Sequence, residues 1–330
     1  MKKLGEEFVK VRVVKMNGVD IGLFQFDFDL TWMCFFMNAN GYTYGRYGMR
    51  KNEHAEGMLS TKGLVKAMHG ALDAHKTDSA KKPAEWTRRT ADSIKAVPEP
   101  IKSGKNCMHC HMVWGFERRD APISKEAAQE LYPLPENLGI TMDVDDPNVV
   151  KSVEGAAKKA GVAPGDRVTA INGARVLSSA DIAFALHTLP KGGEIKIEIG
   201  GKSVVVVPEG DWRKRDISWR STMWALKPAP GFGGKMLTDA EKKRDGVDAP
   251  WAMKVNYIVD WGDQAALGKA IKAAGLAKED IVVSIAGKND FASELAMQTW
   301  FRLTQKGGTE IEVVFWRKGE KKTIKIPVVE

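Results

Sequence analysis

The chain has 330 residues, of which 43% are hydrophobic and 28% are charged, and its formal net charge is +8. This length accommodates two or three domains, and the spread of the lysines along the chain predicts no nucleic-acid partner. No run of 18 or more apolar residues occurs, so the sequence predicts no membrane span. The composition leaves open whether the protein is an enzyme.

The first 77 residues carry signals for several strands and one helix. Runs of β-branched or aromatic residues predict strands over residues 9–14, 33–38 and 42–47, with an Asn-Gly turn between the last two. A helix is predicted over residues 61–75, because a Ser-Thr pair can cap its start and its apolar residues share one face. A strand, a hairpin and a closing helix in this order resemble the second half of a thioredoxin fold.

A half-domain has consequences for the rest of the molecule. The strand and the W-C-x-x-C helix that open a thioredoxin are missing, so we expect residues 1–77 to be a partial thioredoxin-like domain. It is either a half-domain or a domain whose first half was lost upstream of Met1. An exposed sheet edge and apolar face promote self-association, so we expect a homodimer through this region.

The string Cys107-Met108-His109-Cys110-His111 is the strongest chemical signal in the chain. C-x-x-C-H is the attachment signature of a c-type haem: each thiol forms a thioether, and the following histidine ligates the iron. The sequence therefore predicts haem c on Cys107 and Cys110, with His111 as proximal ligand.

Other interpretations of this string stay open. The two thiols with His109 or His111 could hold copper or zinc. They could also form a redox-active or structural dithiol pair. For a haem, His75 at the end of the predicted 61–75 helix is our candidate for the distal ligand.

Two stretches further along the chain repeat one another. Residues 160–173 read AGVAPGDRVTAING and residues 274–287 read AGLAKEDIVVSIAG, and each is followed by a helix signal, a Gly-Gly turn and two strands. Such a repeat indicates duplication. The shared string resembles the PDZ domains of bacterial periplasmic proteases and related proteins, although no protease motif such as G-x-S-x-G accompanies it.

The PDZ resemblance implies a peptide-binding groove. PDZ domains add a C-terminal peptide to a strand, and amides of a glycine-containing loop hold its carboxylate. In the first repeat we assign that loop to Leu138, Gly139, Ile140 and Thr141, and the helix over residues 179–189 to the other wall. In the second repeat we place the corresponding strand at residues 253–258, which contain no glycine, and therefore expect an altered or structural groove.

These signals predict an α+β multidomain protein with a partial thioredoxin-like α/β unit, a haem-loop segment and two PDZ-like β-barrel or sandwich domains. The boundaries that we predict are 1–77 for the thioredoxin-like part, 78–132 for the linker with the C-x-x-C-H string, 133–210 for the first PDZ-like domain, 211–250 for a Trp/Pro/Gly-rich connector and 251–330 for the second PDZ-like domain.

The combination resembles the thioredoxin-like/PDZ domain-containing proteins, some of them selenoproteins, of planctomycete-type bacteria. Besides the C-x-x-C-H string, the match rests on FDFDLT at residues 26–31, YGRYG at 44–48 and SWR at 218–220. It implies a periplasmic or extracellular redox-associated protein. We therefore expect a haem-c protein for electron transfer or redox sensing that docks to redox partners or protein C-termini. The alternatives are a copper, zinc or thiol-redox protein, and a PDZ adaptor without redox chemistry.

Overall fold

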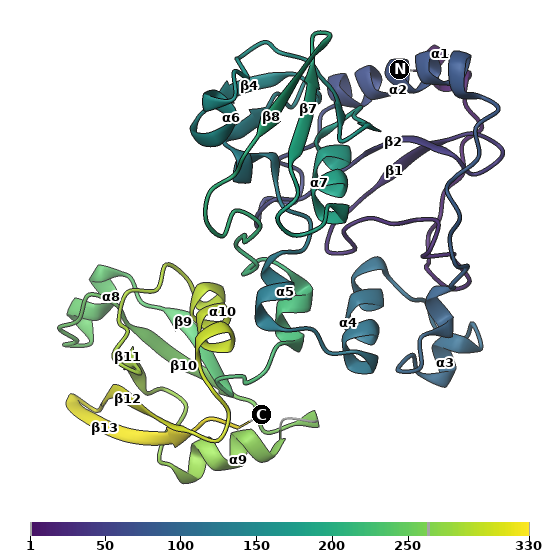
Figure 1. Cartoon of the computed structure of the whole chain (residues 1–330). Coiled ribbons are helices and arrows are strands. Elements are labelled where there is room, and N and C mark those ends of the chain that lie inside the picture. The colour runs from purple at the N-terminus through teal and green to yellow at the C-terminus, as the bar shows by residue number, and fades with distance from the viewer. Residues whose placement is uncertain (1, 263–264, 330) are drawn as a thin grey trace. The chain divides into compact units, whose positions relative to one another are not determined.

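The structure is a computed structural model that describes residues 2–262 and 265–329, and it divides into two compact units. Unit 1 comprises residues 1–216 and unit 2 comprises residues 217–330 (Figure 1). Each unit has its own hydrophobic core. The strands form open sheets, so the α+β class holds, whereas the predicted barrel is wrong for the described part of the chain.

The N-terminal part of unit 1 contains a hairpin and a long helix where the sequence predicts them. β1 (Cys34–Met37) pairs antiparallel with β2 (Thr43–Tyr47), and Gly41 in the turn has a φ of 86°. α2 (Thr61–Asp78) starts at Ser60, whose side chain accepts a hydrogen bond from the Gly63 amide. The buried face of α2 and the hairpin share one apolar cluster.

The strand that we predicted over residues 9–14 does not form. The backbone there has no strand partner among the described residues, and Val9 and Val11 are 94% and 82% exposed. A β-branched sequence fits a pleated surface, but it becomes a strand only when another strand is there to pair with it. A hairpin and one helix remain of the expected thioredoxin-like part, and that resemblance is not confirmed.

The middle of unit 1 is packed more firmly than its irregular sequence suggests. Short helices from residues 91–120 form one apolar cluster with residues 16–28 of the N-terminal segment. The first helix of the unit and the helical segments of this middle part are α1 (Lys2–Gly5), η1 (Ala91–Ser93), α3 (Glu99–Lys102), α4 (Cys110–Asp120) and α5 (Lys125–Gln129).

The last part of unit 1 consists of short antiparallel strands and three helical segments. β3 and β4 form a two-stranded sheet, and β6, β5, β7 and β8 form a second sheet in that spatial order. Alternate residues of β7 are buried, as expected for a strand with one face on the core. The elements are η2 (Pro135–Leu138), β3 (Ile140–Met142), β4 (Val150–Val153), α6 (Gly155–Lys159), β5 (Val168–Ile171), β6 (Ala174–Arg175), α7 (Ser179–Thr188), β7 (Ile195–Ile199) and β8 (Lys202–Val206).

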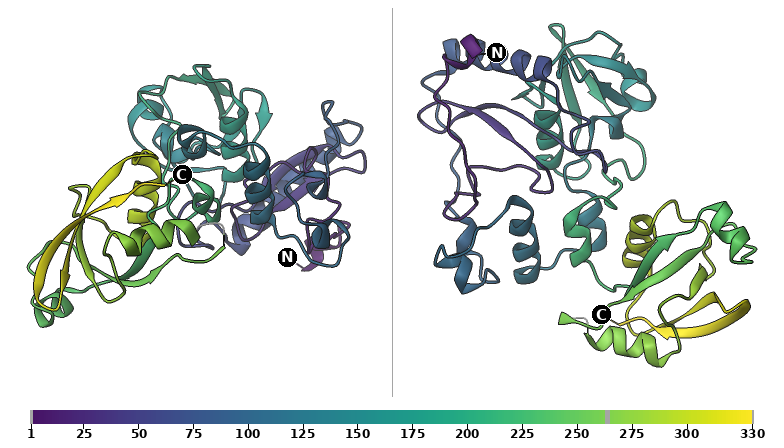
Figure 2. Two further views of the ribbon diagram at one scale, coloured as in Figure 1. Left: turned by 90° about the horizontal axis from the view of Figure 1, so that it is seen from below. Right: turned by 180° about the vertical axis from the view of Figure 1, so that it is seen from behind.

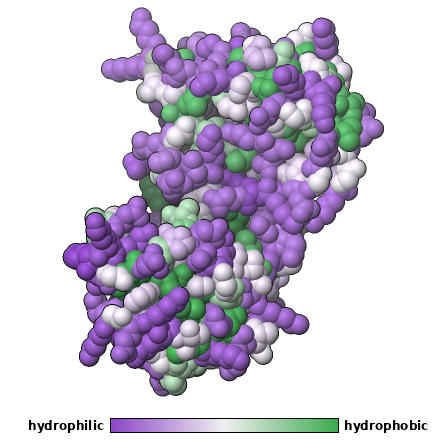
Figure 3. Space-filling view, turned by 90° about the vertical axis from the view of Figure 1, so that its left-hand side faces the viewer, coloured by the Kyte–Doolittle hydropathy of each residue, from purple (hydrophilic) through white to green (hydrophobic). Residues whose placement is uncertain are grey.

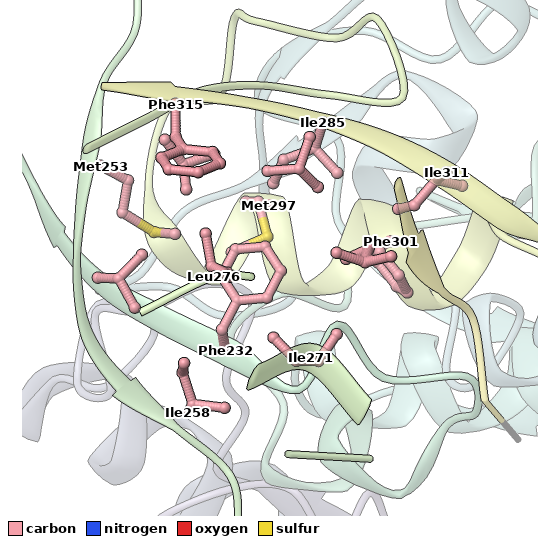
Figure 4. Close-up of a cluster of buried hydrophobic side chains, with 14 of the residues drawn as sticks. Phe232, Met253, Ile258, Ile271, Leu276, Ile285, Met297, Phe301, Ile311 and Phe315 are labelled. Carbon is pink, nitrogen blue, oxygen red and sulfur yellow. The ribbon is translucent and has the colours of Figure 1, made fainter. Parts of the chain in front are cut away.

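Unit 2 repeats this order of elements around a five-stranded sheet, β13-β12-β11-β10-β9. Its core is lined by apolar side chains from the sheet and from α9 and α10 (Figure 4). The long β12–β13 hairpin, drawn in yellow, is visible in both views of Figure 2. The elements are η3 (Ser221–Ala225), β9 (Phe232–Met236), α8 (Asp239–Arg244), β10 (Met253–Ile258), α9 (Ala265–Ala273), β11 (Ile281–Ile285), α10 (Glu294–Thr304), β12 (Glu310–Arg317) and β13 (Glu320–Pro327).

The correspondence between the units is element by element. β3, β4, α6, β5, α7, β7 and β8 of unit 1 match β9, β10, α9, β11, α10, β12 and β13 of unit 2 in chain order, and the pairs β3–β4 and β9–β10 are both antiparallel. The stretch that we assigned to a connector contributes β9 and α8 to this fold. The five-part division of the chain stays a prediction.

The face of the molecule in Figure 3 is mainly hydrophilic, with small separate hydrophobic areas. Within the described residues, no helix combines the length and the apolar character that crossing a membrane requires.

Candidate functional site

A candidate peptide groove lies in unit 1 along the free edge of β3. The Glu154 amide donates to the Gly139 carbonyl at 2.8 Å, so Gly139 and every second residue after it direct their backbone groups toward β4. Ile140 and Met142 direct theirs toward the other edge, which no strand of the described chain covers. This edge offers the donors and acceptors that an added peptide strand needs.

The predicted carboxylate loop, Leu138 to Thr141, precedes that edge. Gly139 has a left-handed φ of 83°, and a Cβ at this position would lie 2.2 Å from the Glu154 carbonyl oxygen, so only glycine fits. The Gly139 amide donates to the carbonyls of Pro135 and Glu136 and closes the η2 turn. Within this loop the Gly139 amide is therefore already used, whereas the Ile140 amide faces the open edge and is free to hold a carboxylate.

The helix beside the groove, α7, is enclosed on nearly every side. Ile182 and Leu186 face the core of the PDZ-like part. Ala180 and Ala183 face Met49 and other apolar residues from outside that part. A helix that is apolar all round is a buried helix, so α7 joins the N-terminal half of unit 1 to its second half.

A buried carboxylate anchors the start of α7. Asp181 accepts hydrogen bonds from the backbone amides of Arg46, Leu177 and Ser178, and its Oδ1 lies 3.6 Å from the Arg46 guanidinium. Burial raises the pKa of Asp181 to about 6, against the opposing effects of the Arg46 charge and the three amides. Because Asp181 binds β2 through the Arg46 amide, this carboxylate fixes the N-terminal hairpin onto α7.

The other end of α7 is covered by side chains of the same unit. The ring of Tyr132 stacks on His187 with 4.1 Å between centroids. Arg213 donates to the carbonyls of Leu186, His187 and Leu189, which are acceptors at the helix end. The end of the groove near the Gly139 loop is thus already ordered by contacts within unit 1.

The C-x-x-C-H string lies at the start of α4. All three cysteines of the chain are free thiols; Cys107 is exposed, whereas Cys110 is half-buried in the first turn of the helix. Met108 between them is fully buried, and its backbone carbonyl accepts a hydrogen bond from the Met16 amide at 2.8 Å. Burial raises the pKa of the Cys110 thiol, which lowers its reactivity.

The histidines that we considered as ligands are all exposed. His109 and His111 are exposed, and their rings are stacked with centroids 6.0 Å apart. His75, our candidate distal ligand, is also exposed, and its Nδ1 lies 2.6 Å from the Tyr44 hydroxyl. In the described parts of the chain, no three His, Cys, Asp or Glu side chains gather in an arrangement that could hold a metal ion.

The residues of the C-x-x-C-H string can attach haem c covalently, but the surrounding side chains are less suited to enclose the haem. Two free thiols and an exposed imidazole at the required spacing are present. The apolar neighbours Met108, Val113 and Phe116 are already packed into a filled core. A haem held by Cys107, Cys110 and His111 would therefore lie at the surface of unit 1.

The second groove differs from what we predicted. We assigned its peptide-binding strand to residues 253–258, but these residues form β10, the counterpart of β4. The counterpart of β3 is β9, and Gly231 before it has a left-handed φ of 75°, like Gly139. The loop of the second repeat thus contains glycine after all, and the string Gly231-Phe232-Gly233-Gly234 was the signal that could have revealed it.

Comparisons with known proteins agree with part of this picture. A family model described as a PDZ domain matches residues 149–199, so the chain contains a PDZ domain in the second half of unit 1. The solved structure "HtrA-type protease AlgW with decapeptide" has 15% identity and a TM-score of 0.25, and 41% of each chain is covered.

A substituted form of that protease, also with a decapeptide, has 13% identity and a TM-score of 0.29, and the match covers 55% of this chain and 54% of that one. The present chain therefore spans about half of these proteins or less. A search among curated proteins finds no match.

Proposed function

We propose that this protein is a docking protein that binds the C-terminal peptide of a partner along β3, beside α7. The observation that carries the proposal is the open edge of β3, where the backbone groups of Ile140 and Met142 point away from β4 behind a left-handed glycine. The PDZ match over residues 149–199 supports it, because β-strand addition is how PDZ domains recognise peptides.

Peptide binding to the full chain tests the proposal. Peptides with free apolar C-termini should bind, and amidation should weaken binding at least about tenfold, because a charged acceptor makes stronger hydrogen bonds to amides than a neutral one. The Gly139→Ala variant should lose binding, since its Cβ would meet the Glu154 carbonyl at 2.2 Å.

Gly173→Ala is the matched control for that variant. Gly173 also has a positive φ of 79°, but a Cβ there meets nothing within 4 Å. The Gly173→Ala variant carries a similar backbone strain, but its Cβ clashes with no neighbouring atom. Its peptide affinity should therefore stay within about twofold of the wild type. Equal affinity for acid and amide peptides would overturn the proposal.

We also propose that the C-x-x-C-H segment carries a covalently bound c-type haem for electron transfer or redox sensing. The observation in its favour is that Cys107 and Cys110 are both free and that His111 is exposed in the first turn of α4. Haem attachment of this kind implies a periplasmic or extracellular protein with redox partner proteins. Copper or zinc on the same residues is the alternative cofactor.

Export of the chain together with a haem-ligation system tests the haem. The mass should increase by one haem, and replacing both Cys107 and Cys110 by Ala should abolish the increase. Cys34→Ala is the control, because Cys34 lies in β1 outside the string and should leave attachment unchanged. A colourless protein that carries stoichiometric copper or zinc would show that the haem assignment is wrong.

A further inference from the structure

Both units place an aromatic ring over a basic side chain at the end of the groove helix. In unit 1 the Tyr132 ring stacks on His187, and in unit 2 the Trp224 ring lies over the Arg302 guanidinium, 4.8 Å from the ring centroid. Each aromatic residue stands eight positions before β3 or β9, and each basic residue stands nine positions after the N-cap serine of α7 or α10. The arrangement is therefore part of the duplicated fold.

In unit 2 this arrangement leaves a buried positive charge that has no counter-ion among the described residues. Arg302 is 3% exposed, and its Nη1 donates only to the Gln298 carbonyl and side chain. Its buried Nε has no hydrogen-bond partner, and no carboxylate of the described chain forms an ion pair with it. Burial lowers the pKa of Arg302 to about 10. A buried charge without a partner of opposite charge is unfavourable, and a bound carboxylate would supply that partner.

The groove next to Arg302 is polar and is occupied by side chains of its own helix. β9 is the edge strand of the five-stranded sheet. The Gly234 amide donates to the Glu294 carboxylate at 3.1 Å, and the Gln298 side chain donates to the Phe232 carbonyl at 2.8 Å. Two side chains of α10 thus make, on the free edge of β9, bonds of the kind that a peptide backbone would make there.

The counterparts of these residues in unit 1 have a different chemistry. Counting from the N-cap serine of each helix, Glu294, Gln298 and Arg302 of α10 stand where Ser179, Ala183 and His187 stand on α7. The groove of unit 2 has an acid at one end and a guanidinium at the other. A ligand for it must therefore present a negative and a positive group at matching positions.

We propose that the β9/α10 groove is a second peptide site, which binds a free C-terminal carboxylate on Arg302 and a basic side chain on Glu294. Trp224 is 41% exposed and forms part of the cover over Arg302, so it moves aside when the carboxylate enters. The peptide backbone replaces the Glu294 and Gln298 side chains on the edge of β9. The bond that Glu294 loses to the Gly234 amide is replaced by its pairing with the basic side chain.

The spacing on α10 fixes where the basic residue belongs. Arg302 and Glu294 are eight residues apart on a helix, which is about 12 Å along its axis. A strand covers that distance in between three and four residues. Side chains on one face of a strand alternate, so the third and fifth residues from the C-terminus share the face of the last residue. These are the positions for lysine.

The test uses the full chain with Gly139→Ala in every variant, because the groove of unit 1 would also bind a peptide with a free apolar C-terminus. The ligands are synthetic hexapeptides of sequence Gly-Lys-Gly-Lys-Gly-Val, acetylated at the N-terminus. We expect the free acid to bind at least tenfold more tightly than the amide, and also at least tenfold more tightly than the same peptide with Glu in place of both Lys. Arg302→Met should abolish the preference for the acid, and Glu294→Gln should abolish the preference for Lys over Glu. Trp224→Leu should increase the affinity severalfold, because the cover becomes smaller.

Controls separate this site from the groove of unit 1. In the same Gly139→Ala background, Arg244→Met removes an exposed arginine of unit 2 and should leave binding of the lysine peptide unchanged. Thermal unfolding of Arg302→Met shows whether this variant is folded. If Arg302→Met is unfolded, the loss of lysine preference in Glu294→Gln is a second, independent test of the site. If Gly139→Ala alone abolishes binding of the lysine peptide, the unit 1 site stands and the unit 2 site is disproved. Equal binding of acid and amide by the folded Gly139→Ala chain also disproves the unit 2 site.

Discussion

α7 and α10 occupy the same place in the two units, but they differ in their surroundings. From Ser179 to Ala183 every residue of α7 is buried, whereas Leu295 on α10 is 38% exposed and Glu294 and Trp300 are half-buried. An amphipathic helix covers one core; a helix that is apolar all round needs a second layer. In unit 1 the N-terminal hairpin and the Leu131–Tyr132 segment provide that layer. The comparison indicates that α7 is a structural hub, meaning a buried helix that joins the two halves of unit 1. In unit 2, α10 is a partly exposed helix that forms one wall of the groove.

A charge placed on each helix gives the largest expected difference. Ala183→Glu puts a carboxylate at a position that is 4% exposed and packed against apolar neighbours, so unfolding of unit 1 should become easier by about 3–5 kcal/mol. Leu295→Glu puts the same group at the surface of α10, and its effect should stay within about 0.5 kcal/mol. Urea denaturation followed by tryptophan fluorescence measures both. Equal destabilisation by the two variants would contradict the hub role of α7.

The unfolding free energy of unit 1 should depend on pH through the titration of Asp181. Its pKa in the folded chain is about 6, against an ordinary value of 3.8, because burial raises it more than the Arg46 charge and three backbone amides lower it. The folded chain therefore binds a proton more tightly than the unfolded chain. The stability that protonated Asp181 contributes is fully present below about pH 4 and is lost as the pH rises through about 6, a loss of about 3 kcal/mol.

The measurement is the difference in unfolding free energy between the wild type and Asp181→Asn from pH 4 to pH 7. Asparagine does not titrate, so the wild type should lose stability relative to the variant as the pH rises. Other carboxylates act in the opposite direction, since ion pairs lower the pKa of Asp146 and Asp78, and the subtraction removes them. A flat difference would show that burial does not raise the pKa of Asp181.

The sequence predicts the local elements of these units better than their contacts. The repeated strings at residues 160–173 and 274–287 coincide with β5 and β11 and the turns around them, because Gly and Asp at fixed spacing encode local turn geometry. The Asn-Gly hairpin and the 61–75 helix are local in the same sense. The strand over residues 9–14 failed because its formation depends on a partner strand that the local sequence cannot supply.

The candidate sites show the same division between local and long-range information. The Gly139 loop could be recognised from its own residues, but its counterpart at Gly231 was missed, because the segment with α8 between β9 and β10 shifts it along the chain relative to the repeat. Arg302 carried no signal as a single arginine. Its buried, unpaired state follows from Gln298 and Trp224, and only the folded chain brings them together.

The smallest expected difference concerns the two N-cap serines. The Ser178 hydroxyl accepts from the Ala180 amide at 3.1 Å, and the Ser293 hydroxyl accepts from the Ala296 amide at 3.0 Å, so replacing either by Ala should cost about 1 kcal/mol for the cap. Ser178 is also buried and donates to the Arg46 carbonyl at 2.5 Å. Ser178→Ala therefore leaves a buried carbonyl without this donor and should cost about 1 kcal/mol more than Ser293→Ala. Denaturation curves of the two variants measure the loss of unfolding free energy in each case. Equal losses would mean that the hydrogen bond from Ser178 to the hairpin adds no stability to the cap of α7. That result would contradict the hub role of α7 at the start of the helix.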